Sequence, residues 1–442
     1  MSTSTESEGS VAAGDPVASS PVYPRGSRVN ERGHLEVGGC DVVELAREFG
    51  TPAYVYAEDD IRSRAREFIA AFGERTDSFE VLFAAKALPC TAVLRLCAEE
   101  GLSVDVASGG ELHLALRGGC EPARIHLHGN NKSEAELRYA FETGVGHLIL
   151  DSLDEIERAE RLLDRPQRAL IRITPGIEPS THTYVQTGQL DSKFGFGLAE
   201  GHAEMAVERV RAARHLRLVG VHAHIGSQIY ELEPYVRAIE VLAEFTRSVD
   251  LEPEVLNVGG GLGIAYLDSD RPPSIEEYVE VKVRGVQRVF ERQPKVLVEP
   301  GRSLVGNAGI TVYEVGTVKE VPGVRTYVAV DGGMSDNLRP MLYGSRYEAL
   351  IADRAGEPAD TPATIAGMHC ESGDVLIRDA ELAAPAVGDV LVTPATGAYG
   401  HAMANNYNGV PRPPILFCRG GEARVVVRRE TWDDLVARDT ER

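Results

Sequence analysis

Short apolar runs alternate with longer amphipathic segments along residues 45–320. The runs have the length of buried strands, and nine of them lie at residues 53–56, 81–85, 103–106, 125–128, 147–150, 169–173, 218–222, 255–258 and 295–298. Amphipathic segments at residues 59–72, 133–142 and 152–163 predict helices, and Ser133 is suited to cap the second of them. Strand–helix alternation repeated about eight times predicts a parallel (β/α)8 TIM-type barrel, with a doubly wound sheet as the alternative.

The pattern changes after about residue 320. Short strand-like runs at residues 324–330, 363–366, 390–393 and 423–427 are separated by Gly, Pro and Asp, which predicts a C-terminal β-rich domain, a sandwich or a barrel. Residues 1–28 are rich in Ser, Thr, Gly and Pro and are expected to form a disordered tail. We therefore predict that a strand within residues 29–44 joins the β-rich domain, that residues 45–320 form the barrel, and that residues 321–442 form the second domain.

Composition narrows the classes of partner. The 442 residues carry a formal charge of −21, which argues against nucleic acid or an anionic membrane surface as a partner. Six cysteines without a CxxC pair argue against a disulfide framework and a structural zinc site, and they favour the cytoplasm. The chain has no apolar run long enough for a transmembrane helix and no recognisable secretory signal, and we expect no metal.

Lys86 follows directly after a predicted barrel strand, in the sequence Phe-Ala-Ala-Lys-Ala. Partial desolvation at a barrel mouth is expected to lower the pKa of such a lysine. An amine of this kind can form a Schiff base with an aldehyde cofactor or a carbonyl substrate. A lysine that merely extends to solvent from a strand end is the alternative.

Glycine-rich and histidine-containing segments end two further strands. Residues 257–263 read Asn-Val-Gly-Gly-Gly-Leu-Gly, in which backbone N–H groups could approach a phosphate, although a simple tight turn is an equal alternative. His222 and His224 lie two residues apart and so share one face of a strand. They could bind a metal, stack on an aromatic cofactor, or pack in the core.

Charged and polar groups follow another strand and lie within the β-rich half. Glu299-Pro-Gly-Arg302 could pair a carboxylate with a ring nitrogen and an arginine with a phosphate or carboxylate, or could form a surface ion pair. Cys370 precedes Glu371, an arrangement that could supply a proton donor beside an amine-binding carboxylate, or could be an ordinary loop. Tyr399, in a turn-rich stretch, could donate a hydrogen bond to a cofactor or substrate.

Together these segments resemble the fold-type III, pyridoxal-phosphate-dependent amino acid decarboxylases, whose barrel is of the alanine racemase type, and within them the diaminopimelate decarboxylase family. The resemblance covers about residues 30–430 and rests on seven segments in the same order. These are Phe-Ala-Ala-Lys86, Asp105-Val-Ala-Ser-Gly-Gly-Glu111, His128-Gly-Asn-Asn-Lys-Ser133, His222-Ala-His-Ile-Gly-Ser-Gln228, Gly259-Gly-Gly-Leu-Gly263, Glu299-Pro-Gly-Arg302 and Cys370-Glu-Ser-Gly-Asp374.

The resemblance implies that pyridoxal 5′-phosphate is the cofactor. Lys86 would hold it as a Schiff base, His224 would stack on the pyridine ring, and Glu299 would keep the ring nitrogen protonated. The other residues implied near the phosphate and ring are Asp105, Ser227, Gly260, Gly261, Gly301, Arg302 and Tyr399.

The resemblance also implies a substrate and an assembly. The substrate is an amino acid, meso-2,6-diaminopimelate, which would lose carbon dioxide to give L-lysine. Its distal carboxylate would be bound by Arg302, Arg339 and Tyr343, with Tyr399 nearby, and its distal amine by Glu371. Cys370 would donate the proton that replaces the carboxyl group. In this family the last two residues come from the neighbouring subunit, so a homodimer is implied.

Two features depart from the family pattern: Leu88, where many relatives have Asn, and the N-terminal tail. Two other functions stay open. One is a decarboxylase of another basic or D-amino acid on the same scaffold. The other is a non-catalytic pyridoxal-phosphate-binding protein.

Overall fold

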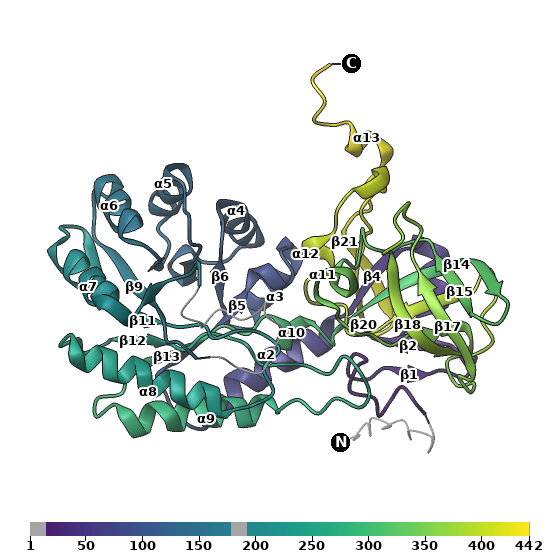
Figure 1. The fold of residues 1–442 in the computed structure, drawn as a ribbon, viewed down its shortest axis with the longest axis horizontal. Helices are drawn as coiled ribbons and strands as arrows, with labels where there is room; N and C mark the ends of the chain where they lie inside the picture. Colours follow the sequence, from purple (N-terminus) through teal and green to yellow (C-terminus); the bar gives the residue numbers. More distant parts are fainter. Residues whose placement is uncertain (1–14, 178–191, 442) are drawn as a thin grey trace, which may run out of the picture.

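Two domains lie side by side in the computed structural model, which describes residues 15–177 and 192–441 (Figure 1). The first domain is a closed barrel of eight parallel strands in the described part of the chain, in which β13 pairs back with β5. Closure of the ring confirms the (β/α)8 prediction and excludes a doubly wound sheet. The strands are β5 (Phe79–Ala84), β6 (Ser103–Val106), β7 (Ile125–Leu127), β8 (His147–Leu150), β9 (Gln167–Thr174), β11 (Leu216–His222), β12 (Val255–Asn257) and β13 (Lys295–Val298).

The barrel strands are buried on both faces, which explains why their sequences are continuously apolar rather than alternating. One face packs against the surrounding helices. The other contributes to a small separate cluster formed by Leu82, Ile149, Leu170, Val219, Val255 and Leu297, which come from six different strands and fill the barrel interior. Because this layer fills the interior, functional side chains have to lie beyond it, at the carboxyl ends of the strands.

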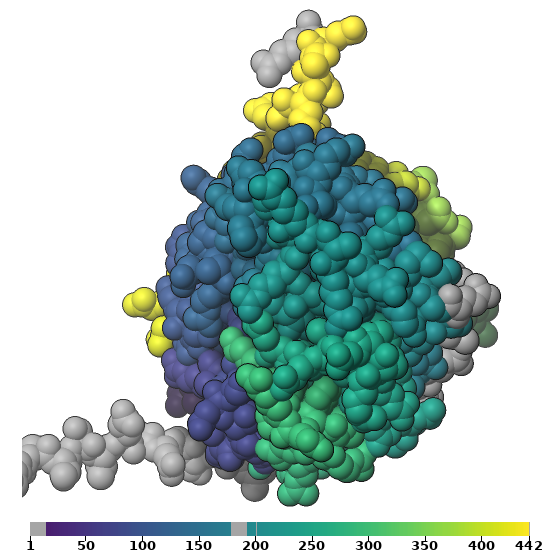
Figure 2. All heavy atoms as spheres, turned by 90° about the vertical axis from the view of Figure 1, so that its left-hand side faces the viewer, coloured from purple at the N-terminus to yellow at the C-terminus, as the bar shows by residue number. Residues whose placement is uncertain are grey.

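Helices surround the barrel and cover the end of the molecule that Figure 2 shows. They are α2 (Glu58–Gly73), α3 (Thr91–Glu99), α4 (Gly109–Gly118), α5 (Glu134–Thr143), α6 (Leu153–Leu162), α7 (His202–Ala212), α8 (Glu233–Ser248) and α9 (Ile275–Val289). The predicted cap is confirmed, since Ser133 and Glu136 form a capping box at the start of α5. No helix among the described residues is long and apolar enough to cross a membrane.

The second domain is β-rich, as predicted. Its main sheet has the strand order β18-β17-β15-β14-β4-β20-β21, and β19 pairs with both β14 and β16. The strands are β4 (Ala53–Ala57), β14 (Gly309–Val321), β15 (Arg325–Val330), β16 (Leu350–Ile351), β17 (Thr361–Ala366), β18 (Val375–Leu382), β19 (Val390–Thr393), β20 (Ile415–Arg419) and β21 (Glu422–Val427). Beyond β21 the chain forms α13 (Trp432–Leu435), which projects from the domain and is followed by a short extended segment (Figure 1).

The prediction that residues 53–56 form a barrel strand is wrong. Strand β4 pairs with β14 and β20 in the β-rich domain, and β14 already begins at Gly309. All five residues of β4 are buried, a pattern that fits either domain. The domain boundaries predicted at residues 45 and 320 are therefore misplaced. They assign β4 and the first part of β14 to the barrel, although both belong to the β-rich domain.

The N-terminal region also differs from the prediction. Residues 28–41 form their own antiparallel sheet of β1 (Arg28–Val29), β2 (Leu35–Val37) and β3 (Cys40–Asp41), followed by α1 (Val42–Phe49). This sheet packs on the core of the β-rich domain instead of joining its sheet. Residues 15–28 are not a disordered tail, because Val17, Val22 and Tyr23 are buried in the same core. Residues 1–14 of the predicted tail lie outside the described part of the chain.

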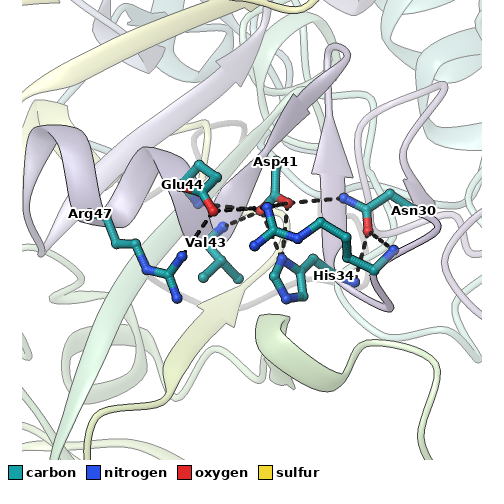
Figure 3. Close-up of polar contacts among 7 residues, drawn as sticks. Asn30, His34, Asp41, Val43, Glu44 and Arg47 are labelled. Atoms are coloured by element: carbon teal, nitrogen blue, oxygen red, sulfur yellow. Dashed lines mark hydrogen bonds and ion pairs between the residues drawn. The ribbon is translucent and has the colours of Figure 1, made fainter.

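Asp41 connects this small sheet to α1 (Figure 3). Its carboxylate accepts hydrogen bonds from the backbone N–H groups of Val43 and Glu44 and so caps the helix. The same carboxylate contacts His34 Nδ1 at 2.9 Å and accepts from Asn30 Nδ2 at 3.1 Å. Burial alone would raise the pKa of Asp41, but the bonds from His34 and Asn30 outweigh it and the pKa is lowered.

We expect Asp41→Ala to lower the free energy of unfolding by about 1–2 kcal/mol, as for other lost N-caps. Because the folded-state pKa of Asp41 is lowered, its contribution is present above the usual aspartate range and is lost as the pH falls through the folded-state pKa. Urea unfolding at neutral and acidic pH measures both effects. Asp41→Asn keeps a capping oxygen and serves as the control, and equal stability of the alanine variant and the unaltered protein would contradict the assignment.

Candidate active site

One cavity of about 260 Å³ opens where the barrel strands end, between the barrel and the β-rich domain. Active sites of (β/α)8 barrels form at this carboxyl-terminal face. The cavity brings together most of the residues that the sequence singled out, from segments up to about 300 residues apart: Lys86, Asp105, His224, Ser227, Gly261, Glu299, Gly301, Arg302, Arg339, Tyr343 and Tyr399. Gly260 is buried immediately beside the cavity and donates its N–H to His224 Nδ1 at 3.3 Å.

Lys86 enters the cavity from a single 3-10 turn, residues Ala85–Ala87, directly after β5. The turn is anchored to the second domain, because the Tyr399 N–H donates to the Ala87 carbonyl at 2.8 Å. Among the described residues the Lys86 amine makes no hydrogen bond, so it is available to a ligand. The expected lowering of its pKa is wrong: burial does act in that direction, but the carboxylate of Asp105, with Tyr399 and Glu299, outweighs it and raises the pKa of Lys86.

Glu299 lies directly after β13 and is contacted by side chains at or next to the ends of three other strands. His128 Nε2 is 3.1 Å and His222 Nε2 is 3.2 Å from its two oxygens, and Asn257 Nδ2 donates at 2.6 Å. Burial alone would raise the pKa of Glu299, but His128 and His222 lower it well below its usual value. The cavity therefore holds an ionised carboxylate in a fixed orientation, suited to pair with a protonated ring nitrogen.

The same cluster has the composition of a metal site. One ligand atom each from His128, His222 and Glu299 lies within 4.8 Å of the others. The rest of the cavity favours anions instead, since Lys86, Arg302 and Arg339 all line it and would repel an added cation. We interpret the two histidines as groups that hold Glu299 ionised.

The glycine-rich loop follows β12 and comes close to neighbouring backbone. Gly261 has φ +105°, and a side chain there would meet the Gly226 carbonyl at 2.6 Å, so only glycine fits. The His224 ring lies against this loop, next to the Gly260 N–H. Burial, together with the nearby positive charges of Lys86 and Arg172, lowers the pKa of His224 well below its usual value. A neutral ring is consistent with Nδ1 accepting the Gly260 N–H.

Two buried arginines, Arg302 and Arg339, line the side of the cavity that faces the β-rich domain. Arg302 donates to Ser227 Oγ at 2.9 Å, and Arg302 and Arg339 both donate to the Tyr266 hydroxyl. Neither arginine forms an ion pair with a carboxylate among the described residues. Burial alone would raise the pKa of Tyr266, but the two guanidinium groups lower it. Two buried guanidinium groups that share one hydroxyl and have no carboxylate partner would be strongly stabilised by a bound anion.

The Tyr399 ring lies close to both guanidinium groups. Its ring centroid is 4.8 Å from Arg302 Cζ and 5.7 Å from Arg339 Cζ. Its φ of +66° is in the left-handed region, a conformation that costs free energy for a tyrosine and is concentrated at functional sites. The sequence-based suggestion that Tyr399 contacts a cofactor or substrate is thus compatible with its position.

Cys370 and Glu371 do not join this cavity. Both are exposed at the end of β17, on a loop held by buried Asp374, which accepts from the N–H and the Nδ1 of His369 at 2.9 and 2.8 Å. The Cys370 N–H donates to Asn408 at 3.0 Å, in the segment that follows α12 (Gly400–Met403), whose Met403 lines the cavity. Their predicted roles stay predictions, and within one chain they are separate from Lys86.

Several cavity residues received no role from the sequence. They are His128, Arg172, Phe194, Ser303 and Met403, with Asn257 and Tyr266 behind them; for His222 the sequence had left open a metal site, stacking on a cofactor and core packing. His128, His222 and Asn257 each lie at or next to the end of a barrel strand, so strand-end position was the available signal. Nothing in the local sequence marked Tyr266, which lies on a connecting segment.

Comparison with known proteins agrees with this geometry. Residues 58–306 match the family model for the pyridoxal-binding domain of pyridoxal-dependent decarboxylases. The chain is 49% identical to the diaminopimelate decarboxylase of Bacillus subtilis over 93% of its own length and 97% of that protein. It is 44% identical to the diaminopimelate decarboxylase of Mycobacterium tuberculosis, with 94% and 97% covered.

Solved structures show the same similarity. The crystal structure of diaminopimelate decarboxylase from M. jannaschii superimposes with a TM-score of 0.88 at 33% identity, covering 93% of this chain and 97% of that one. A second structure of that enzyme, in complex with L-lysine, superimposes with a TM-score of 0.87 at the same identity and coverage.

Proposed function

This chain belongs to the diaminopimelate decarboxylase family of pyridoxal-dependent enzymes, and from that premise we propose a role for each side chain at the cavity. The reaction is decarboxylation of meso-2,6-diaminopimelate to L-lysine and carbon dioxide, the last step of lysine biosynthesis. When bound, pyridoxal phosphate supplies an electron sink for the charge left on the α-carbon as carbon dioxide departs. The observation that carries the assignment of roles is that Lys86, Glu299 and the pair Arg302–Arg339 face one cavity.

The donors and acceptors of the cavity fit this cofactor. The Lys86 amine would hold its aldehyde carbon, and the ionised Glu299 would keep a proton on the ring nitrogen. His224, neutral and fixed by the Gly260 N–H, would pack on the ring. The phosphate would be bound by Ser227 and by the glycine-rich loop at Gly261, with Gly260, Gly301 and Asp105 beside the cofactor.

Substrate selection would depend on the other wall. Arg302, Arg339 and Tyr343 would bind the distal carboxylate, with the Tyr399 ring close to both guanidinium groups. A substrate that lacks this carboxylate, such as ornithine, would leave two buried cations unpaired, which costs much affinity.

We infer that two copies of the chain pair so that each supplies Cys370 and Glu371 to the cavity of the other. This is supported by the exposure of both residues and by the anchoring of their loop to the segment that follows α12, next to the mouth. Cys370 would donate the proton to the α-carbon, and Glu371 would bind the distal amine. The six free cysteines support a reducing compartment, and we propose the cytoplasm.

A decarboxylation assay tests the substrate. The purified protein with pyridoxal phosphate is offered meso-diaminopimelate, L-ornithine, L-arginine and L-lysine separately, and carbon dioxide and products are followed. We expect lysine from diaminopimelate and no turnover of the other three, because only diaminopimelate pairs both distal charges. Turnover of ornithine or arginine instead would contradict the roles of Arg302 and Arg339, and cofactor binding without any turnover would favour a non-catalytic protein.

A further inference from the structure

Lys282 is a fully buried lysine behind the glycine-rich loop. It lies on α9, on the side of the loop away from the cavity, and the chain has only six lysines among its 46 basic residues. Its amine donates to the carbonyls of Val258 and Gly259 at 2.7 and 2.9 Å. No carboxylate forms an ion pair with it among the described residues. Burial of an amine without a carboxylate is costly, so its hydrogen bonds to the loop are what hold it there.

Aromatic rings of two tyrosines enclose the Lys282 amine. Nζ lies 4.3 Å from the ring centroid of Tyr278, one turn earlier on α9, and 4.6 Å from that of Tyr235 on α8. The Tyr278 hydroxyl reaches the same loop, within 3.2 Å of the Gly259 carbonyl and 3.1 Å of the Gly260 carbonyl. Two side chains of α9 therefore engage the three successive carbonyls of residues 258–260.

These contacts, together with the Glu299 N–H, which also donates to the Gly259 carbonyl at 3.2 Å, hold the loop carbonyls and so fix the direction of its N–H groups. In a trans peptide the C=O and the following N–H face opposite directions, so carbonyls turned toward α9 direct the next N–H groups away from it. The Gly259 N–H accordingly donates to Asn257 Oδ1 at 3.0 Å, and the Gly260 N–H to His224 Nδ1 at 3.3 Å. The third peptide, turned the same way, aims the N–H of Gly261 toward the cavity that Gly261 lines.

We propose that Lys282, together with Tyr278, is a positioning residue: from behind the loop it orients the His224 ring, through the Gly260 N–H, and aims the Gly261 N–H at the cofactor's phosphate. The inference rests on the proposed function in that the loop binds this phosphate. Burial lowers the pKa of Lys282 well below its usual value, against the opposing effect of Glu299. Either protonation state of the amine has enough hydrogens for both carbonyls, so the role is one of hydrogen bonding.

Binding of cofactor to the apoprotein tests the inference without turnover. Lys282→Met keeps the length of the side chain and removes both donors, and Tyr278→Phe removes the hydroxyl and keeps the ring. Tyr235→Phe is the matched control, because its ring also contacts the Lys282 amine while its hydroxyl has no hydrogen-bond partner within residues 15–177 and 192–441. The dissociation constants of pyridoxal phosphate and of pyridoxal are measured for each, with the 31P NMR shift of the bound phosphate.

We expect Lys282→Met to weaken pyridoxal phosphate binding by about 10–100-fold, with a smaller change for pyridoxal and a moved 31P signal. Tyr278→Phe should also weaken pyridoxal phosphate binding and move the 31P signal. Tyr235→Phe should leave the affinity and the 31P signal unchanged. If Lys282→Met does not fold, the inference is tested by comparing the pyridoxal phosphate affinity and the 31P shift of Tyr278→Phe with those of Tyr235→Phe.

Two results would overturn the inference. One is unaltered pyridoxal phosphate affinity and 31P shift in Lys282→Met and Tyr278→Phe. The other is an equal loss for pyridoxal and its phosphate, which indicates a merely structural role. Failure of the proposed function is distinguishable, because it appears in the unaltered protein as cofactor binding without decarboxylation of diaminopimelate, and the comparison of variants is still valid.

Discussion

Lys86→Ala is expected to lower kcat by at least about 10⁴-fold, because no other amine of the described cavity can hold the cofactor covalently. Borohydride treatment followed by mass measurement of the denatured chain should find the cofactor attached to the unaltered protein and absent from the variant. Lys319→Ala, at an exposed position of β14, is the control and should keep full activity.

The fold of the variant is expected to be preserved, since the Lys86 side chain makes no hydrogen bond among the described residues and the backbone of its turn is held by Tyr399. Full activity of Lys86→Ala, or cofactor still attached to it after borohydride treatment, would contradict the role given to this residue. A loss of activity together with unfolding would show in circular dichroism, and the attachment measurement on folded protein then decides.

Cys370→Ala is expected to retain cofactor binding while losing about 10²–10⁴-fold in turnover, the usual effect of removing a proton donor. The cysteine is exposed and does not line the cavity of its own chain, so in the proposed pairing it acts on the cavity of a second copy. Ser372→Ala, on the same exposed loop, is the control for disturbance of that loop.

A mixed dimer tests the same arrangement directly. When Lys86→Ala and Cys370→Ala chains are co-expressed and assort at random, half of the two-fold dimers contain one of each. Each mixed dimer would have one site with both an intact lysine and an intact cysteine, so activity should recover to about a quarter of that of the unaltered protein. If both residues act within one chain, the mixture stays as inactive as its two parents, and the proposed assembly is wrong.

Periodic sequence patterns were sufficient for the barrel strands and for the three helices predicted, α2, α5 and α6. Eight of the nine predicted strands lie in the barrel, and Ser133 caps α5 as predicted. Such features depend on neighbours within a few residues, through burial period and capping chemistry. The exception is β4, since a strand that is buried on both faces looks the same in either domain.

The residues to which we assign roles in the proposed reaction were also largely visible in the sequence, because most of them follow an apolar strand. Lys86, His224 and Glu299 are examples, and the cavity contains all three. Buried positions in the N-terminal region were missed, since Val17, Val22 and Tyr23 are isolated among small and polar residues and become a core only against the β-rich domain.

Electrostatic balance and orientation depended on residues that meet only when the chain is folded. The sequence indicated a desolvated Lys86 with a lowered pKa, but the nearby carboxylates of Asp105 and Glu299 raise it. The orientation of the glycine-rich loop depends in the same way on Lys282, on a different element of the barrel. The succession of strands along the chain, the residues that follow each strand and their chemical type are local properties that a sequence carries. Charge interactions and backbone orientation instead depend on distances between segments far apart in the chain, and only folding establishes these distances.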